Sequence, residues 1–235
     1  MDIQAGTLYL VSTPIGNLED ITLRALDVLK SVDLIAAEDT RHTRGLLTHF
    51  DIHVPLASCH AFNEHEKSSR LLDEIASGKN IALVSDAGTP SVADPGFYLV
   101  REAAKREIPV EVIPGVSAVT FAVTASALPV DRFAFFGFAP VKSGQKESFF
   151  RQILDSGITT FFFESPYRIA KTLELIARLA PEREIAVIRE ATKIHEEVLR
   201  GSAVQLAADT RNWKGEFVIG ISKYDVRKSE TGEKL

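Results

Sequence analysis

Apolar and polar positions in the first half of the chain follow two alternating patterns. Short apolar runs predict buried strands at Thr7–Thr13, Asp33–Ala37, Val54–Cys59, Ile81–Ser85 and Val110–Ile113. Between them, apolar residues at helical spacing predict helices at Ile21–Val32, Thr40–Phe50, Asn63–Ser77 and Gly96–Glu107. Strands separated by helices pair in parallel through right-handed crossovers. This half is therefore predicted to be a mostly parallel sheet with helices on both faces.

The second half of the chain predicts a mixed α/β sheet. The expected strands are Phe133–Phe138, Thr159–Phe163, Ile185–Arg189, Glu196–Arg200 and Phe217–Ser222, and the expected helices between them are Gln145–Asp155 and Pro166–Ala180. An apolar helix at Val116–Leu128 precedes these elements and places the domain boundary near Pro129. We expect an N-terminal α/β domain at residues 1–128, a C-terminal α/β domain at residues 129–224, and a polar, disordered tail at residues 225–235.

The net charge of −5 limits the partners that the chain can bind. Proteins that hold nucleic acid non-specifically carry a basic face, so a nucleic-acid substrate must meet a local basic patch or arrive already folded. No apolar run approaches the roughly 18 residues of a membrane span, and no export signal is seen at the N-terminus. The single cysteine, Cys59, cannot form an internal disulfide. We expect a cytoplasmic protein.

Several common cofactor and metal motifs are missing from the sequence. No two of the 14 glycines are separated by a single residue, which excludes the dinucleotide fingerprint G-x-G-x-x-G. The motifs G-x-x-x-x-G-K-[ST], H-E-x-x-H and C-x-x-C are also missing. Cys59, His60 and His65 lie close in sequence, but they fit strand-end and loop positions better than a metal site. No metal is expected.

Three glycine- and proline-rich loops follow predicted strands. They are Ser12–Asn17, Asp86–Gly96 and Pro114–Ala118, and each joins the carboxyl end of a strand to the start of a helix. Open α/β sheets bind ligands at this edge, where glycine lets the backbone approach a ligand and proline fixes the loop. Helix capping, as at Asp94-Pro95 and Ser165-Pro166, is the alternative interpretation. Capping does not require three such loops on one edge, so we expect a binding site.

The second loop restricts the kind of ligand. It begins with the carboxylate of Asp86, and no lysine or arginine lies between Asp86 and Gly96. A triphosphate would need cations there. A ligand with an apolar ring, hydroxyls and a positive centre fits better, and S-adenosylmethionine meets that description.

These loops resemble those of a known enzyme family. The loop after the first strand, D-A-G-T-P-S-V-A-D-P-G at Asp86–Gly96 and I-P-G-V-S-A at Ile113–Ala118 resemble the tetrapyrrole-methylase superfamily of S-adenosylmethionine-dependent enzymes. Four further segments resemble the branch that methylates the ribose 2′-hydroxyl of a cytidine in 16S ribosomal RNA: T-P-I-G-N-L-E-D at Thr13–Asp20, A-E-D-T-R at Ala37–Arg41, E-S-P-Y-R at Glu164–Arg168 and R-E-A-T-K at Arg189–Lys193. The resemblance extends over nearly the whole chain.

The resemblance implies a homodimeric methyltransferase that binds S-adenosylmethionine in a cleft between its two domains. The implied substrate is 16S ribosomal RNA, and the acidic net charge favours the assembled small ribosomal subunit over free RNA. Carried over motif by motif, the implied cofactor contacts are Leu10 and Pro14 on the first loop, Asp86, Gly88 and Thr89 on the second, Ser117 and Ala118 on the third, and Phe163, Ala191 and Glu216 in the second domain.

Residues Glu38 to His42, where the second strand ends, are candidates for the chemistry. A ribose hydroxyl is a poor nucleophile, so a general base should help, and Asp39, Arg41 and His42 stand on the same edge as the three loops. A helix cap at Asp39 and a solvated first turn after it are the alternative.

Contacts to RNA are expected from a local basic patch formed by Arg41, Arg44, Arg168 and Lys193. The alternative for each of these residues is a surface salt bridge.

Two other functions stay open from the sequence. The methyl acceptor could be a carbon of a tetrapyrrole ring, but that site would need room for a large flat ring and cations for its carboxylates. The same loops could also hold a nucleotide-like ligand in a binding module without turnover. An assay of methyl transfer distinguishes the three functions. Transfer to small ribosomal subunits indicates the RNA methyltransferase, transfer to a porphyrinogen indicates the tetrapyrrole methyltransferase, and transfer to neither indicates the binding module.

Overall fold

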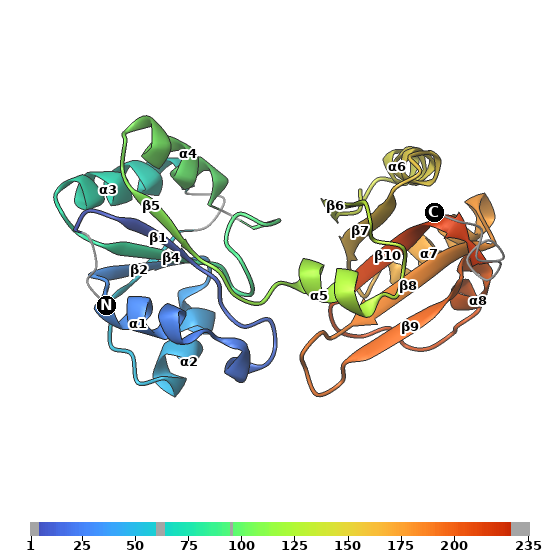
Figure 1. Cartoon of the computed structure of the whole chain (residues 1–235), viewed down its shortest axis with the longest axis horizontal. Coiled ribbons are helices and arrows are strands. Elements are labelled where there is room, and N and C mark those ends of the chain that lie inside the picture. Colours follow the sequence, from blue (N-terminus) through green and yellow to red (C-terminus); the bar gives the residue numbers. More distant parts are fainter. Residues whose placement is uncertain (1–4, 60–63, 95, 227–235) are drawn as a thin grey trace. The chain divides into compact units, whose positions relative to one another are not determined.

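The computed structural model describes residues 5–59, 64–94 and 96–226 (Figure 1). The chain divides into two compact units between Ser117 and Ala118, and each unit holds its own five-stranded sheet. The predicted fold class, a parallel α/β sheet followed by a mixed one, is confirmed. Within the described residues, none of the helices has both the length and the apolar character of a membrane span.

The first unit is built on a parallel sheet with the strand order β3-β2-β4-β1-β5. Leu8 on β1 lies opposite Ile81 on β4 and Val110 on β5. The strands of this sheet are β1 (Leu8–Val11), β2 (Leu34–Ala37), β3 (Leu56–Ser58), β4 (Ile81–Val84) and β5 (Val110–Ile113). Strand β5 has the predicted bounds, and the other four are shorter than the apolar runs that predicted them.

Helices cover both faces of this sheet (Figure 1). Successive residues of a strand point to opposite faces, so Tyr9 and Val11 pack with α1 (Leu23–Ser31) and α2 (Thr40–His49). Leu8 and Leu10 pack on the other face with α3 (Glu64–Ala76) and α4 (Phe97–Lys105). The neighbouring strands β1 and β4 are followed by helices on opposite faces. A topological switch point, where open α/β sheets bind ligands, therefore lies between them.

Side-chain caps set two of the helix starts in this unit. Thr22 Oγ1 accepts a hydrogen bond from the N–H of Ala25 (3.1 Å) at the start of α1, and Asp39 caps α2. The alternative interpretation of Asp94-Pro95 as a helix cap is wrong, because α4 begins at Phe97 after Gly96, which has a φ of +130° and makes no side-chain cap. Pro95 itself lies outside the described residues.

The second unit has a mixed sheet with the order β6-β7-β10-β8-β9, in which only β6 and β7 pair in parallel. One face packs on three helices, α6 (Ser143–Asp155), α7 (Ile169–Leu179) and α8 (Ala203–Ala207). The alternative interpretation of Ser165-Pro166 as a helix cap is also wrong, because Arg168 is the N-cap of α7. The strands are β6 (Phe133–Phe138), β7 (Thr159–Glu164), β8 (Arg183–Arg189), β9 (Glu197–Ser202) and β10 (Phe217–Asp225).

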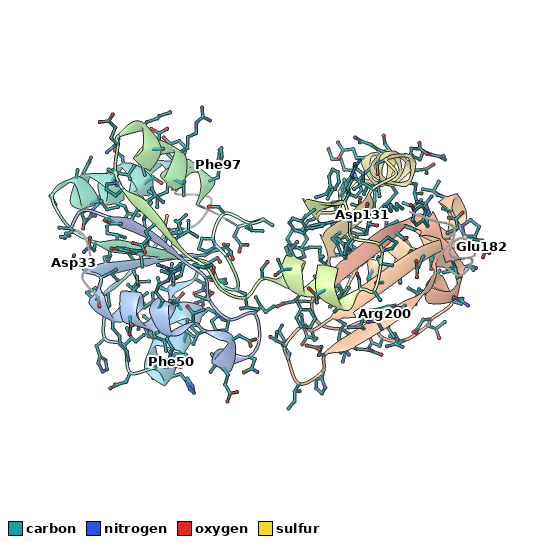
Figure 2. All side chains as sticks on the ribbon, viewed as in Figure 1. Asp33, Phe50, Phe97, Asp131, Glu182 and Arg200 are labelled. Carbon is teal, nitrogen blue, oxygen red and sulfur yellow. The ribbon has the colours of Figure 1, made fainter. Side chains whose placement is uncertain are left out.

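Helix α5 (Ala118–Ala125) covers the other face of this second sheet. Its Ala122 packs with Phe161, and Arg200 on β9 donates hydrogen bonds to the carbonyls of Ala125 and Ser126 at the end of α5 (Figure 2). Because these contacts lie within the second unit, the chain divides before α5 and not after Leu128, where the sequence places the boundary. The expected tail begins inside β10, and residues 227–235 lie outside the described residues.

Candidate active site

Three loops meet at the carboxyl edge of the first sheet. Thr13 and Gly88 exchange backbone hydrogen bonds of 2.9 and 3.0 Å, which join the loop after β1 to the loop after β4. The hydroxyls of Ser12 and Thr89 lie 2.9 Å apart and form a second link. The N–H of Ser12 also donates to the carbonyl of Ile113 at the end of β5 (3.1 Å). The loops that the sequence singles out therefore form one connected edge.

Two glycines let these loops approach one another. A Cβ on Gly115 would lie 2.8 Å from the Cβ of Ser12, closer than real Cβ atoms come to one another. Gly88 adopts a φ of +78°, in the left-handed region that favours glycine, and a Cβ there would lie 3.3 Å from Cγ2 of Ile15. A larger residue at Gly115 would push the first and third loops apart.

The loop after β4 is strained. Ser91 and Ala93 have φ values of +71° and +63°, in a region that costs a residue with a Cβ roughly 1–2 kcal/mol. The Oγ of Ser91 is buried and has no hydrogen-bond partner among the described residues. Strained backbone and unpaired polar atoms are concentrated at ligand-binding sites, so both features support this loop as part of one.

Three carboxylates gather beside these loops. Asp86 accepts a hydrogen bond from the backbone N–H of Asp39 (2.9 Å). Burial raises the pKa of Glu38 above its ordinary value, and the carboxylates of Asp94 and Asp86 raise it further. Burial also raises the pKa of Asp94; a hydrogen bond with Ser85 lowers it in part and Asp86 adds to the rise. Because the described residues supply no cation that offsets these shifts, the group favours a positively charged ligand.

The predicted catalytic residues lie at the start of α2, with Asp39 as its N-cap and Arg41 and His42 on its first turn. The carboxylate of Asp39 accepts hydrogen bonds from the backbone N–H of Arg41 (2.8 Å) and from its Nε (3.2 Å) and Nη2 (2.9 Å). The guanidinium and then the backbone N–H of Arg41 lower the pKa of Asp39 to about 2. Asp39 is therefore a charged helix cap at neutral pH and a poor proton acceptor. His42 is exposed on the same turn.

The cofactor contacts that the resemblance implies in the first unit lie along this edge, with one exception. The side chain of Leu10 packs in the core under α3 and α4, so it offers a ligand little beyond its backbone. The others are buried or half-buried in the loops: Pro14, Asp86, Gly88, Thr89 and Ser117. Their assignment to a cofactor stays a prediction.

The implied cofactor contacts in the second unit fall into two groups. Ala118, Phe163 and Ala191 pack against the same apolar cluster, between α5 and its face of the sheet. Glu216 is exposed and its carboxylate pairs with Nζ of Lys193 (3.1 Å). Within this unit the fold therefore brings three of the four residues together and places Glu216 in a separate ion pair.

Two of the predicted RNA contacts are held by carboxylates in the second unit. Nη2 of Arg168 pairs with the buried Glu164 (2.7 Å), and Nζ of Lys193 pairs with Glu190 (3.2 Å). Salt bridging, the alternative for these residues, is thus part of their structure. The other two predicted contacts, Arg41 and Arg44, are exposed on α2 in the first unit. Arg41 also forms a salt bridge, with Asp39 (2.9 Å).

Sequence reasoning missed two features. Asp94 is interpreted there as a helix cap, whereas its carboxyl lies close enough to Asp86 to raise its own pKa. Lys146 and Thr172 also join Glu164 in a buried group, with hydrogen bonds of 2.8 and 2.7 Å to its carboxylate. A signal for this group exists in the sequence, because Lys146 occupies the core-facing stripe of a helix at i, i+4 and i+7 spacing with Phe150 and Ile153.

Of the cysteine and histidine cluster in the sequence, the structure describes the side chain of Cys59 alone. Cys59 is buried just after β3. His60 lies outside the described residues, as does the side chain of His65. In the described part of the chain, no group of three or more His, Cys, Asp or Glu residues could hold a metal ion.

Comparisons with known proteins agree with the motifs. The chain is 46% identical over 217 residues to Ribosomal RNA small subunit methyltransferase I of Halalkalibacterium halodurans, which covers 91% of this chain and 75% of that protein. It is 44% identical over 229 residues to the protein of the same name from Hydrogenobaculum sp., and that alignment covers 95% of this chain and 99% of the relative. In structure it is similar to uroporphyrin-III-C-methyltransferase from Thermus thermophilus, with a TM-score of 0.65 and 21% identity over 93% of this chain and 94% of that one.

The family expected from the loops is confirmed by a match to a family model. The model for Tetrapyrrole (Corrin/Porphyrin) Methylases matches residues 7–207, which include all three loops and both sheets up to α8. Together with the two ribosomal relatives, this match shows that the chain belongs to the tetrapyrrole (corrin/porphyrin) methylases.

Proposed function

We propose that this protein transfers a methyl group from S-adenosylmethionine to the ribose 2′-hydroxyl of a cytidine in 16S ribosomal RNA. The observation that carries the proposal is the 46% and 44% identity, over nearly the whole chain, to two proteins named Ribosomal RNA small subunit methyltransferase I. The choice of a cytidine ribose as acceptor comes from the resemblance at Ala37–Arg41 and Glu164–Arg168.

The carboxylate group of the candidate site suits S-adenosylmethionine. Glu38 and Asp94 lie beside Asp86 with raised pKa values that burial and like charge cause, so a cation bound there would relieve their repulsion. When bound, S-adenosylmethionine supplies a methyl group on a positively charged sulfur. The loop residues that we propose to hold it are Pro14, Asp86, Gly88, Thr89 and Ser117.

The contribution of the chain itself is to position the acceptor and take up its proton. An attacking oxygen has to be held at about 3–3.5 Å from its target, and such positioning is worth roughly 7–11 kcal/mol. The linked loops supply a rigid frame for this. Of the predicted catalytic residues, Asp39 is held as a cap with a pKa of about 2. We therefore propose His42, which is exposed on α2, as a candidate general base to be tested. A general base contributes roughly 10²–10⁴-fold.

The proposed partners are the assembled small ribosomal subunit and a second copy of the chain, in the cytoplasm. A net charge of −5 supports the assembled particle. Because a protein with a net negative charge gains little from bulk attraction to RNA, a preformed shape has to supply the specificity.

Mass spectrometry of ribosomal RNA tests the proposal. RNA from cells that lack the protein should miss one ribose methyl on a cytidine of 16S ribosomal RNA, and expression of the wild-type chain should restore it. An unchanged methylation pattern contradicts the proposal.

Labelled cofactor separates the competing functions. Tritium from methyl-labelled S-adenosylmethionine should pass to small ribosomal subunits from the deletion strain. Transfer to a porphyrinogen instead would support a tetrapyrrole methyltransferase, and cofactor binding with no transfer to either would support a sensor.

A further inference from the structure

One tyrosine is almost fully exposed on the turn between β7 and α7. Tyr167 is 93% exposed, whereas Tyr9 is 2% exposed and Tyr98 and Tyr224 are partly buried. Single exposed apolar side chains are common on protein surfaces. What distinguishes Tyr167 is the rigid turn that holds its ring and the charge beside it.

The backbone that carries Tyr167 is fixed by hydrogen bonds. The N–H groups of Arg168 and Ile169 both donate to the carbonyl of Ser165, at 3.0 and 3.1 Å. The N–H of Tyr167 itself donates to Oγ of Ser165 (3.3 Å), and Pro166 restricts φ within the turn. A ring presented on such a rigid turn loses little conformational freedom when a partner stacks on it.

A buried carboxylate anchors the far side of the turn. The side chain of Glu164 is 0% exposed and binds Nζ of Lys146 (2.8 Å), Oγ1 of Thr172 (2.7 Å) and Nη2 of Arg168 (2.7 Å). Two cations share one carboxylate, so this group carries one net positive charge. The side chain of Arg168 is 24% exposed, and it brings that charge to the surface beside Tyr167.

The start of α7 adds to the positive potential. This helix has Arg168 as its N-cap and no side-chain cap, so its dipole and the N–H groups that follow that of Ile169 favour an anion there. Nε of Arg168 is buried and has no hydrogen-bond partner among the described residues. An exposed aromatic ring next to a site for an anion has the chemistry of a nucleotide-binding element.

We propose that the Ser165–Arg168 turn binds one unpaired nucleotide of the RNA substrate. Tyr167 stacks on the base, and Arg168 with the start of α7 faces the phosphate. Glu164 acts as a positioning residue, because its buried carboxylate fixes the guanidinium of Arg168. This inference rests on the proposed function and extends it by naming a surface of the second unit that meets the RNA.

Substitution of the ring tests the proposal with the full chain and unmethylated small ribosomal subunits. Stacking of a base on an aromatic side chain is worth about 5- to 150-fold in affinity. We expect Tyr167→Ala to raise the KM for subunits within that range and to leave the affinity for S-adenosylmethionine, measured by calorimetry, unchanged. Tyr167→Phe keeps the ring and should keep the KM.

Ile194→Ala is the matched control. Ile194 belongs to the same unit and is 94% exposed, so its removal deletes an equally exposed apolar side chain without an aromatic face. We expect its KM for subunits to stay at the wild-type value. A wild-type KM for Tyr167→Ala, or an equal rise with Ile194→Ala, overturns the proposal.

Two further outcomes separate this inference from others. If light scattering shows that Tyr167→Ala alters the oligomeric mass, the ring belongs to a protein contact and the proposal is overturned. If the wild-type chain methylates no subunits at all, the proposed function fails and this inference fails with it. An active wild-type protein with an unaffected Tyr167→Ala variant contradicts the inference alone.

Discussion

Gly115 lies against Ser12 where the loop after β5 meets the loop after β1. Gly115→Ala would place a Cβ 2.8 Å from the Cβ of Ser12. Because neither group has a flexible side chain that can turn away, the backbone has to move. We expect methyl transfer to small ribosomal subunits to fall by about 100-fold, the loss that a displacement of about 1 Å can cause. Calorimetry should show weaker cofactor binding as well.

The matched control for this change is Gly144→Ala. Gly144 lies in α6, and nothing comes within 4 Å of a Cβ built there. Alanine is favoured over glycine in a helix by up to about 1 kcal/mol, so this variant should be fully active and equally or slightly more stable. Wild-type rate and affinity for Gly115→Ala would contradict the close packing of the two loops.

Glu38 and Asp94 should make cofactor binding dependent on pH. Burial and like charge raise both pKa values, so protonation begins at a higher pH than for ordinary carboxylates. Attraction for a sulfonium is present above the raised pKa values and is lost as the pH falls through them. Folding stability changes in the opposite direction, because a folded state with a raised carboxyl pKa gains stability relative to the unfolded chain as the pH falls.

Calorimetry over a descending pH series measures this effect. S-adenosylmethionine should lose affinity earlier than S-adenosylhomocysteine, which lacks the sulfonium charge and serves as the control ligand. Glu38→Gln should weaken binding of the charged ligand at neutral pH and flatten its pH dependence. Parallel pH profiles for the two ligands would show that the carboxylates do not face the sulfonium.

Among the elements of the second unit, β7 and α7 depend on one buried ion group. Glu164→Ala leaves Lys146 and Arg168 without their shared carboxylate, and removal of one partner from a buried ion group costs roughly 3–5 kcal/mol. We expect that loss in the free energy of unfolding, measured with denaturant. Glu147→Ala removes the exposed ion pairs that Glu147 forms with Arg151 and Arg178. It should lower the free energy of unfolding by less than about 1 kcal/mol. Equal losses for the two variants would contradict the buried role of Glu164.

Elements with a strong pattern are predicted to the residue, as at Val110–Ile113 and Phe133–Phe138. Elements of only a few residues, and elements whose ends have more than one possible capping residue, are not predicted to the residue. The five-residue α8 escapes prediction from the sequence because one turn shows no periodicity, although Ser202 and Gln205 form a capping box there. The start of α4 is predicted within one residue, but the capping sequence at Asp94-Pro95 is not used, and Gly96 is the N-cap. A Cβ on Gly96 would lie 2.9 Å from Cδ2 of Leu83, a close approach that no local pattern contains.

At the scale of the whole molecule, a net charge of −5 requires that any RNA contact be local. Arg44 is exposed on α2, the helix whose N-cap Asp39 donates its backbone N–H to Asp86 of the candidate site. We expect Arg44→Glu to raise the KM for small ribosomal subunits. The slope of the logarithm of affinity against the logarithm of salt concentration should become shallower by about 0.7–0.9 for each phosphate that the variant no longer neutralises. Arg24→Glu makes the same charge change on the exposed face of α1 and should alter neither quantity. An unchanged salt dependence for Arg44→Glu would remove Arg44 from the RNA surface.

The division into units shows where long-range packing overrides the chain pattern. An apolar helix before Pro129 has no sequence feature that assigns it to one domain. Its place is decided by Ala122 and Leu128, which pack with Phe161, and by the hydrogen bonds that Arg200 donates to the end of α5. Ala118 therefore begins the second unit, although the sequence places it in the first domain.

The sequence by itself determined the fold class, the order of the strands and of the helices other than α8, the family and the three loops that form one edge of the first sheet. It could do so because periodicity and loop composition are local properties. Only the tertiary structure decided that Asp94 joins Glu38 and Asp86, that Asp39 serves as a helix cap, and that Lys146 lies buried against Glu164. The physical reason is that burial and charge interactions depend on residues far apart in the chain, whose distances no local pattern contains.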